Sequence, residues 1–191
     1  MRKNKEMNLI IKYEVFNGHE NEIRTIDLNT ELSVEEFLPL GWELYTENYL
    51  TTENKLGIGM TYCKGKTEHC HLVYLIVIGG KVVKIGGFET GLGKRWGSYT
   101  NGSPDIRKGA GNGSVTNYYV TEAIREALNQ GYKVEWYVKK MEYRTEELTL
   151  YSGEVLSNKI YPIGKYKDHE KDLLTLYESK NGNHPCLSSN S

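Results

Sequence analysis

Two apolar runs joined by a pair of glycines limit what this chain can fold into more than any other feature of its sequence. Residues 72–78 (LVYLIVI) have the length and the β-branched content of a buried strand. Gly79-Gly80 is a tight-turn signal, and residues 81–85 (KVVKI) form the return strand before Gly86-Gly87 ends it. The sequence therefore predicts a β-hairpin at the centre of the fold.

The segments after the hairpin predict helices and one more strand. Residues 100–116 are rich in Gly, Ser and Asn, which indicates a loop, and residues 142–158 are polar. Apolar spacing predicts helices from 116 or 117 to 130 and over 167–179, and we also expect a short helix over residues 92–99 and a strand over residues 134–141. We therefore expect an α+β fold in which helices flank a small three-stranded, mostly antiparallel sheet.

The first 60 residues predict a β-rich extension of this domain. Residues 9–16 alternate loosely, and the turn signal Asn17-Gly18 allows residues 23–28 to return as a second strand. Ser33 followed by Glu36 is a capping box for a short helix. We expect an N-terminal extension over residues 1–60, the main domain over residues 61–185 and a disordered tail over residues 186–191.

Composition excludes some classes of protein. The net charge of −1 gives no bulk attraction to nucleic acid, so any such contact must come from local basic patches. Three Cys, an odd number, argue against a disulfide scaffold and fit a reducing cytoplasm. No apolar run is long enough to span a membrane. The 15 Tyr against 3 Phe suit either a wet, polar partner or a core that uses Tyr in place of Phe.

A cluster of Cys and His lies just before the hairpin. Cys63, His69, Cys70 and His71 could bind a metal, but the cluster lacks the Cys-x2-Cys pair that structural zinc sites share. Metal binding by this cluster stays open.

The hairpin carries two polar groups of chemical interest, Tyr74 and Lys84. A lysine within an apolar strand must reach water at an edge or lie in a polar pocket. A three-residue turn around Gly79-Gly80 would bring the two side chains opposite each other, whereas a strict two-residue turn would put them on opposite faces. The sequence does not choose between these registers, and an exposed Lys84 is the alternative to a functional one.

The order of residues around the hairpin resembles the motif of the GIY-YIG nucleases. That motif has a Tyr in the first strand, a second half ending in Ile-Gly, and an Arg on the next helix, which here are Tyr74, Ile85-Gly86 and Arg95. Leu72 stands where the family has its first Gly, and Lys84 where it has its second Tyr. A group of small type II restriction endonucleases in the family also carries Lys there. Its downstream Thr-Asn-Tyr is similar to Thr116-Asn117-Tyr118.

The resemblance covers about residues 70–130 and is weaker over 145–186, where Glu170 matches the metal-binding Glu of the family. It implies a type II restriction endonuclease that hydrolyses double-stranded DNA at a short (pseudo)palindromic site with one Mg²⁺ ion. The alternatives are a sequence-tolerant nuclease or a DNA-binding module in repair or mobile-element biology. A chance motif on an unrelated hairpin is a third.

The resemblance also implies roles for five residues. Tyr74 would take a proton from the attacking water or orient it, and the charge of Lys84 would lower the pKa of Tyr74. Arg95 would clamp the scissile phosphate. Tyr99, one turn further along the helix, would hold a phosphate oxygen or pack in the core. Glu170 would hold the Mg²⁺ ion, or belong to a solvated helix face.

Recognition of DNA would come from residues near the loop and the second helix. The candidate contacts are Lys94, Arg107, Lys108, Thr116, Asn117 and Tyr118. A flexible surface loop is the alternative reading of residues 100–115. An enzyme that cuts both strands is expected to be a homodimer, and a restriction enzyme implies a partner DNA methyltransferase. The extension over residues 1–60 could then be a sheet extension, a dimer arm or a DNA clamp.

Overall fold

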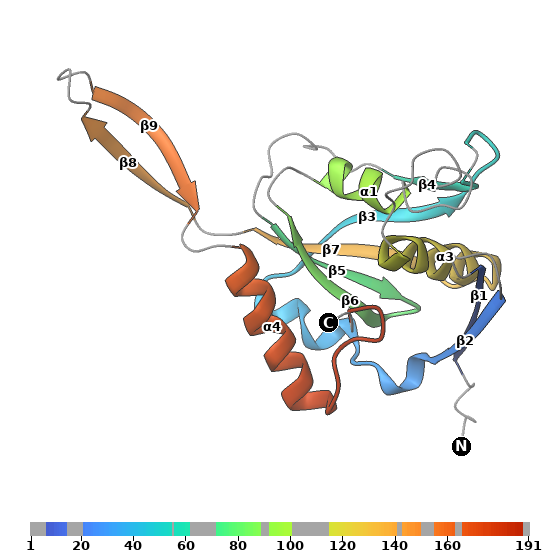
Figure 1. Cartoon of the computed structure of the whole chain (residues 1–191). Helices are drawn as coiled ribbons and strands as arrows, with labels where there is room; N and C mark the ends of the chain where they lie inside the picture. Colours follow the sequence, from blue (N-terminus) through green and yellow to red (C-terminus); the bar gives the residue numbers. More distant parts are fainter. Residues whose placement is uncertain are drawn as a thin grey trace.

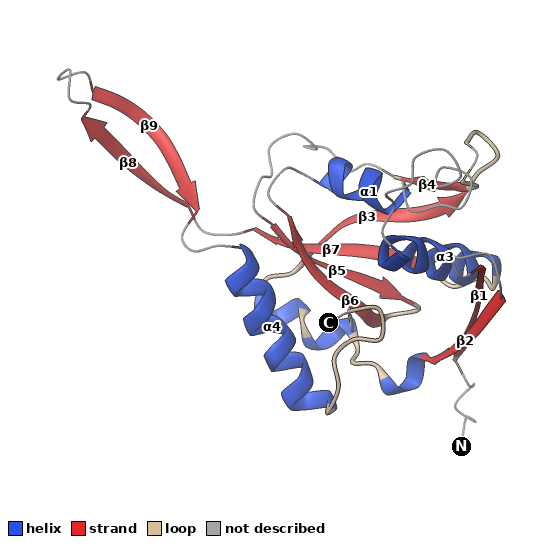
Figure 2. Ribbon diagram, viewed as in Figure 1, coloured by secondary structure: helices blue, strands red, loops and turns tan. Residues whose placement is uncertain are grey.

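The main sheet has five strands rather than the expected three (Figures 1 and 2). The computed structural model describes residues 7–14, 21–54, 56–61, 72–88, 92–100, 115–140, 143–149, 155–162 and 166–188. In the order β4-β3-β7-β5-β6, the strands are β4 (Ile58–Met60), β3 (Glu43–Leu50), β7 (Val134–Lys140), β5 (Leu72–Ile78) and β6 (Lys81–Phe88). All their pairings are antiparallel, which agrees with the expected α+β class.

The strands β3 and β4 lie in the segment that we expected to be an extension. They pair with each other, and β3 pairs with β7, so residues 43–60 complete the main sheet. β1 (Asn8–Glu14) and β2 (Asn21–Asp27) form the predicted hairpin as a separate two-stranded sheet. Between β2 and β3 are three 3-10 helices, Leu28–Thr30, Val34–Glu36 and Leu38–Leu40, and Ser33 caps the second of them.

The register of the central hairpin differs from both expected alternatives. Gly79 and Gly80 form a two-residue turn with φ of 57° and 82°. Tyr74 pairs with Gly86 and Ile76 with Lys84, but Val77 pairs with Val82, so Val83 is a bulge. A two-residue turn without a bulge would place the side chains of Tyr74 and Lys84 on opposite faces of the sheet. The extra residue at the bulge places them on the same face. Tyr74 and Lys84 therefore share a face as diagonal neighbours, and the expectation that only an odd-length turn brings them together was wrong.

Helices cover the two faces of the sheet. α1 (Leu92–Thr100) and α3 (Val115–Asn129) pack on the face that carries Tyr74, around a core that includes Trp136, Trp96 and Ile124. α4 (Tyr166–Asn181) packs on the opposite face, where Tyr177 joins Phe37 and Val82. These three helices agree with the predicted ones within two residues at each end. The arrangement leaves the β6 edge between the two helical layers.

A second hairpin lies in the segment that we expected to be irregular. β8 (Tyr143–Thr149) pairs with β9 (Val155–Pro162), and the pair projects away from the main sheet between β7 and α4 (Figure 1). No helix in the described part of the chain is long and apolar enough to cross a membrane.

Residues 186–188, the described part of the expected tail, contact the main domain. Leu187 is buried, and its backbone N–H donates to the Val83 carbonyl at 2.8 Å. Residues 186–188 therefore extend the main domain along β6, and residues 189–191 lie outside the described part.

Candidate active site

Two tyrosine hydroxyls and one guanidinium meet between β5 and α1. Tyr74 projects from β5, and Arg95 and Tyr99 are four residues apart on α1, so they share a helix face. The two hydroxyl oxygens are 2.5 Å apart. Arg95 Nε donates to Tyr74 at 3.0 Å and its Nη2 donates to Tyr99 at 3.2 Å. The guanidinium carbon lies 4.7 Å from the centre of the Tyr99 ring. Arg95 is thereby held in one orientation.

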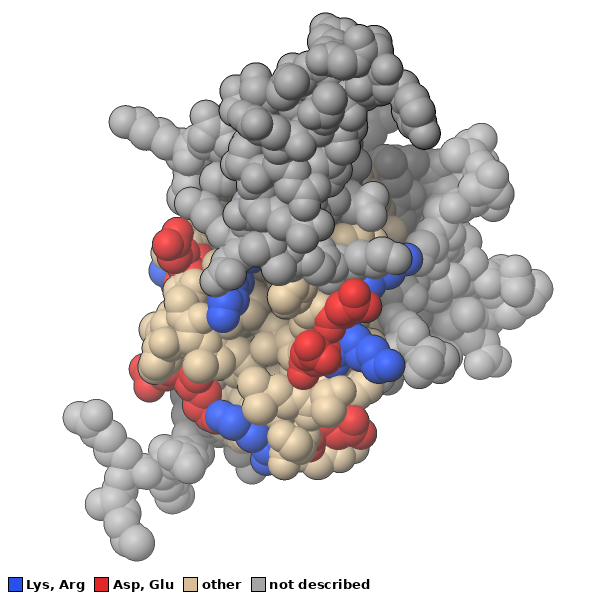
Figure 3. Space-filling model, turned by 90° about the vertical axis from the view of Figure 1, so that its left-hand side faces the viewer, with Lys and Arg blue, Asp and Glu red and all other residues tan. Residues whose placement is uncertain are grey.

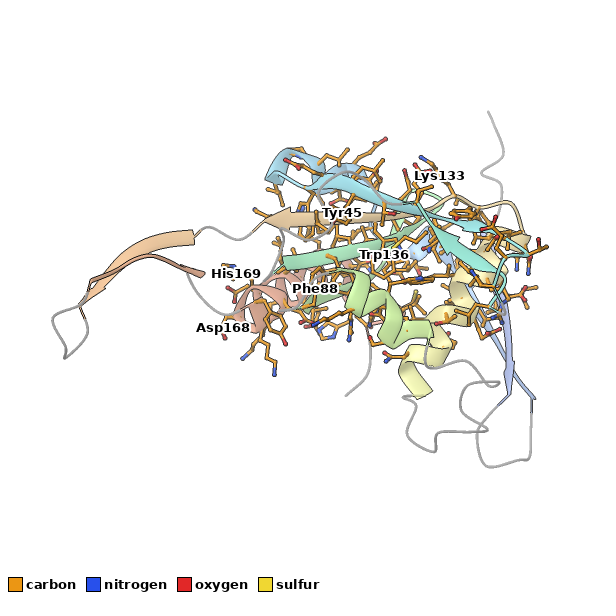
Figure 4. The ribbon with its side chains drawn as sticks, turned by 90° about the horizontal axis from the view of Figure 1, so that it is seen from above. Tyr45, Phe88, Lys133, Trp136, Asp168 and His169 are labelled. Atoms are coloured by element: carbon orange, nitrogen blue, oxygen red, sulfur yellow. The ribbon has the colours of Figure 1, made fainter. Side chains whose placement is uncertain are left out.

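Close packing fixes the Tyr74 ring. It stacks on Trp136 at 5.3 Å between ring centres and lies 5.7 Å from Phe88. Figure 4 labels Trp136 and Phe88. A Cβ on Gly86, which pairs with Tyr74, would lie 2.3 Å from the tyrosine hydroxyl. Only glycine leaves room for the ring there, which gives the Gly of the motif a physical role.

Burial governs the ionisation of both tyrosines. It raises the pKa of Tyr74 above its ordinary value, and the Arg95 charge opposes this only in part. The pKa of Tyr99 is raised well above its ordinary value, again mainly by burial. The cation beside Tyr74 is Arg95, so the expectation that Lys84 lowers the pKa of Tyr74 is corrected. A phenolate at neutral pH is disfavoured at both positions.

Lys84 lies in a buried polar position on the same face of the sheet. Its side chain is 7% exposed, so the alternative of a solvent-facing lysine is wrong. Nζ donates to the Leu187 carbonyl at 2.8 Å. Burial and the nearby Arg95 charge lower the pKa of Lys84 to about 8, while Glu170 acts in the opposite direction. A substantial fraction of this amine is therefore neutral just above neutral pH.

Glu170 reaches the site from α4 at the end of β6. Its carboxylate accepts a hydrogen bond from the Gly87 N–H, and burial raises its pKa while Lys84 and Arg95 oppose the rise. A Cβ on Gly87 would lie 2.3 Å from the Tyr166 ring and 3.1 Å from Glu170 Oε2. Glycine at this position lets α4 approach the strand.

The neighbours of Glu170 on α4 lie in a different environment. Asp168, Lys171 and Asp172 are exposed, and Asp168 and His169 are marked on the helix in Figure 4. Glu170 is half-buried and is influenced by two cations of the site, so it stands apart from the solvated face of its helix.

The expected DNA contacts are only partly described. Lys94 is exposed on α1. Asn117 donates its side-chain amide to the Ser98 carbonyl at 2.9 Å, which ties α3 to α1. Thr116 and Tyr118 lie in α3, but their side chains, together with Arg107, Lys108 and the Cys63, His69, Cys70 and His71 cluster, are outside the described part. On the face shown in Figure 3, the described charges of both signs are interspersed.

Several residues that hold the site together were not predicted from the sequence. Thr121 is buried and donates to the carbonyl of Tyr99 at 2.9 Å. Leu187 accepts from Lys84, and Ser188 Oγ accepts from the N–H of Ile85 at 2.8 Å. The apolar Leu187 beside a small polar residue was the one available signal, and it is too weak to distinguish from a frayed end.

Comparisons with known proteins give matches by structure alone. No protein-family model matches the sequence, and no curated protein matches it at a significant level. The restriction endonuclease HPY188I in complex with product DNA is 26% identical, with a TM-score of 0.54 over 86% of this chain and 90% of that one. A mutant of bacteriophage T4 EndoII is 22% identical, with a TM-score of 0.53 over 75% of this chain and 93% of that one. The chain shares its fold with both.

Proposed function

We propose that this chain is a type II restriction endonuclease of the GIY-YIG superfamily that hydrolyses double-stranded DNA at a short (pseudo)palindromic site. The observation that carries the proposal is Arg95, which is held by two buried tyrosine hydroxyls and lies within electrostatic reach of Lys84 and Glu170. The fold supports the same activity, because HPY188I is a restriction endonuclease whose structure contains product DNA.

Glu170 fits a single hard cation, which we propose to be Mg²⁺. Such an ion is commonly bound by one or two carboxylates, with water and substrate phosphate completing its shell. In the described ranges, no three His, Cys, Asp or Glu side chains gather to form a larger metal centre, which suits a site with one carboxylate. When bound, the ion supplies positive charge against the leaving oxygen. Lys84 and Arg95 repel a free cation, so we expect the metal to bind together with the phosphate.

The residues of the site divide the work of hydrolysis. Arg95 binds the scissile phosphate and offsets the charge that develops on it. The raised pKa values of Tyr74 and Tyr99 disfavour a phenolate base. We assign their hydroxyls the role of orienting Arg95 instead. The Lys84 amine accepts the proton of the attacking water, since a base is most effective when its pKa lies near the working pH.

Cleavage of both DNA strands is best explained by a homodimer, because the described part of one chain holds one such cluster. We propose that the loop over residues 100–115 and the start of α3 recognise the DNA sequence, and that Lys94 contacts DNA beside them. A restriction enzyme needs its host DNA protected, so a neighbouring gene for a DNA methyltransferase is an expected companion.

The competing functions are a sequence-tolerant nuclease and a DNA-binding module. Incubation of the purified chain with bacteriophage DNA and Mg²⁺ separates them. Discrete fragments support a restriction endonuclease, whereas a smear supports a sequence-tolerant nuclease. A gel shift without cutting supports a binding module, and a folded protein that neither binds nor cuts DNA refutes the proposal.

A further inference from the structure

Residues 186–188, which we call the C-terminal strap, lie along the outer edge of β6. The N–H of Leu187 donates to the Val83 carbonyl, and the N–H of Ile85 donates to Ser188 Oγ, each at 2.8 Å. Between these two bonds, the Leu187 carbonyl accepts the bond from Lys84 Nζ. The strap is thus in register with the strand that carries the lysine, and it contacts that lysine directly.

The strap is also anchored on its far side. Leu187 is 2% exposed and packs in the main core. The Cys186 thiol donates to the Val83 carbonyl at 3.8 Å, and the Cys186 backbone N–H donates to the buried carboxyl of Glu31. The same carboxyl accepts a bond from the Tyr177 hydroxyl at 2.5 Å. Contacts to the core, the 3-10 segment and α4 therefore fix the position of the Leu187 carbonyl.

The carbonyl matters because of the charges on either side of Lys84. Arg95 repels the ammonium form of Lys84, and Glu170 attracts it. A backbone carbonyl is a neutral acceptor that holds Nζ without an ion pair. Without that acceptor, the strongest remaining attraction on the flexible lysine is the Glu170 carboxylate.

We propose that the C-terminal strap is a positioning element of the active site, in which the Leu187 carbonyl holds Lys84 Nζ away from Glu170. The lysine is then kept in place for proton transfer, and the carboxylate stays open to its cation. This inference rests on the proposed nuclease function. It gives the strap a role beyond covering the exposed edge of β6, which is the structural alternative.

Truncation is the most direct test. Truncation after Pro185 removes the strap, and truncation after Ser188 is the matched control that keeps it. Under single-turnover conditions with Mg²⁺, we expect cleavage by the first variant to fall about tenfold or more, since the lost bond is to a charged group. Its DNA affinity, measured without divalent cation, stays within about twofold, because binding and chemistry are separate steps. The control cleaves like the parent chain.

Two point variants separate positioning from packing, and they also serve if the shorter chain does not fold. Leu187→Ala keeps the carbonyl but loses the apolar contact that anchors it, so we expect a lower melting temperature and a cleavage rate per folded molecule that falls by less than in the truncation. Ser188→Ala loses the acceptor for Ile85 and should slow cleavage, and Ser188→Thr should restore it.

Three results would overturn the inference. The first is a strapless chain that folds, binds DNA and cuts at the parental rate. The second is a Leu187→Ala chain that loses as much activity per folded molecule as the truncation. The third is a Ser188→Ala chain that cuts like the parent. A parent chain that does not cut DNA refutes the proposed function, and this inference with it.

Discussion

Gly87→Ala tests whether the close approach of α4 to β6 sets the position of Glu170. The new Cβ would lie 2.3 Å from Tyr166 Cδ2 and 3.1 Å from Glu170 Oε2. Carbon atoms pack best at about 3.5 Å or more, so the ring must retreat by roughly 1.2 Å (3.5 − 2.3). Tyr166 begins α4, and Glu170 follows one turn later. A displacement of about 1 Å can slow an enzyme about 100-fold, so we expect a loss of that order.

The assay is the single-turnover cleavage rate, with thermal unfolding measured alongside it. We expect Gly87→Ala to lower the free energy of unfolding by about 1–3 kcal/mol, as overpacking does, and still to bind DNA. Gly93→Ala is the control, because a Cβ there meets no atom within 4 Å. Adding Tyr166→Ala should restore part of the cleavage by Gly87→Ala. A folded Gly87→Ala chain that cuts as fast as the parent refutes the reasoning.

Three further predictions concern other groups of the fold. The pKa of Lys84 is lowered to about 8, so the cleavage rate should rise with pH and level off above that value. A rate that is flat from about pH 6.5 to 9.5 contradicts its role as base. Tyr99→Phe removes the 2.5 Å hydrogen bond to the Tyr74 hydroxyl and should slow single-turnover cleavage about tenfold or more. Tyr132→Phe, the control, should not slow it. Tyr177→Phe removes one hydrogen-bond donor from the buried carboxyl of Glu31, and urea unfolding should show a loss of about 1–3 kcal/mol. An unchanged urea midpoint for Tyr177→Phe would contradict this prediction.

Local patterns predicted the parts of the fold that local interactions determine. The central hairpin carries two apolar runs joined by Gly79-Gly80, apolar spacing marks α3 and α4, and these elements were found together with α1 and β7. β3 was missed because its buried residues do not alternate, and β4 has only three residues. β8 and β9 were missed because β8 and the start of β9 lie in a stretch that we interpreted as polar, whereas their ladder is formed by the main chain.

The site was predicted as a set of residues but not as a set of contacts. Tyr74, Lys84, Arg95, Tyr99 and Glu170 come together in the structure. No sequence pattern indicates the bulge at Val83, so the sequence could not predict that Tyr74 and Lys84 share a face of the sheet. The bond from Lys84 to Leu187 spans 103 residues, a separation over which no local pattern carries information.

The comparison of Glu170→Ala with Asp172→Ala tests the central claim most directly. Both variants remove one carboxylate from α4, but Glu170 lies half-buried beside the cations of the site and Asp172 is exposed. Each is incubated with bacteriophage DNA and Mg²⁺, and DNA binding is measured in parallel. We predict that Glu170→Ala binds DNA and does not cut it, while Asp172→Ala yields the same discrete fragments as the parent chain. Cleavage by Glu170→Ala at the parental rate would contradict the assignment of this cluster as the nuclease site.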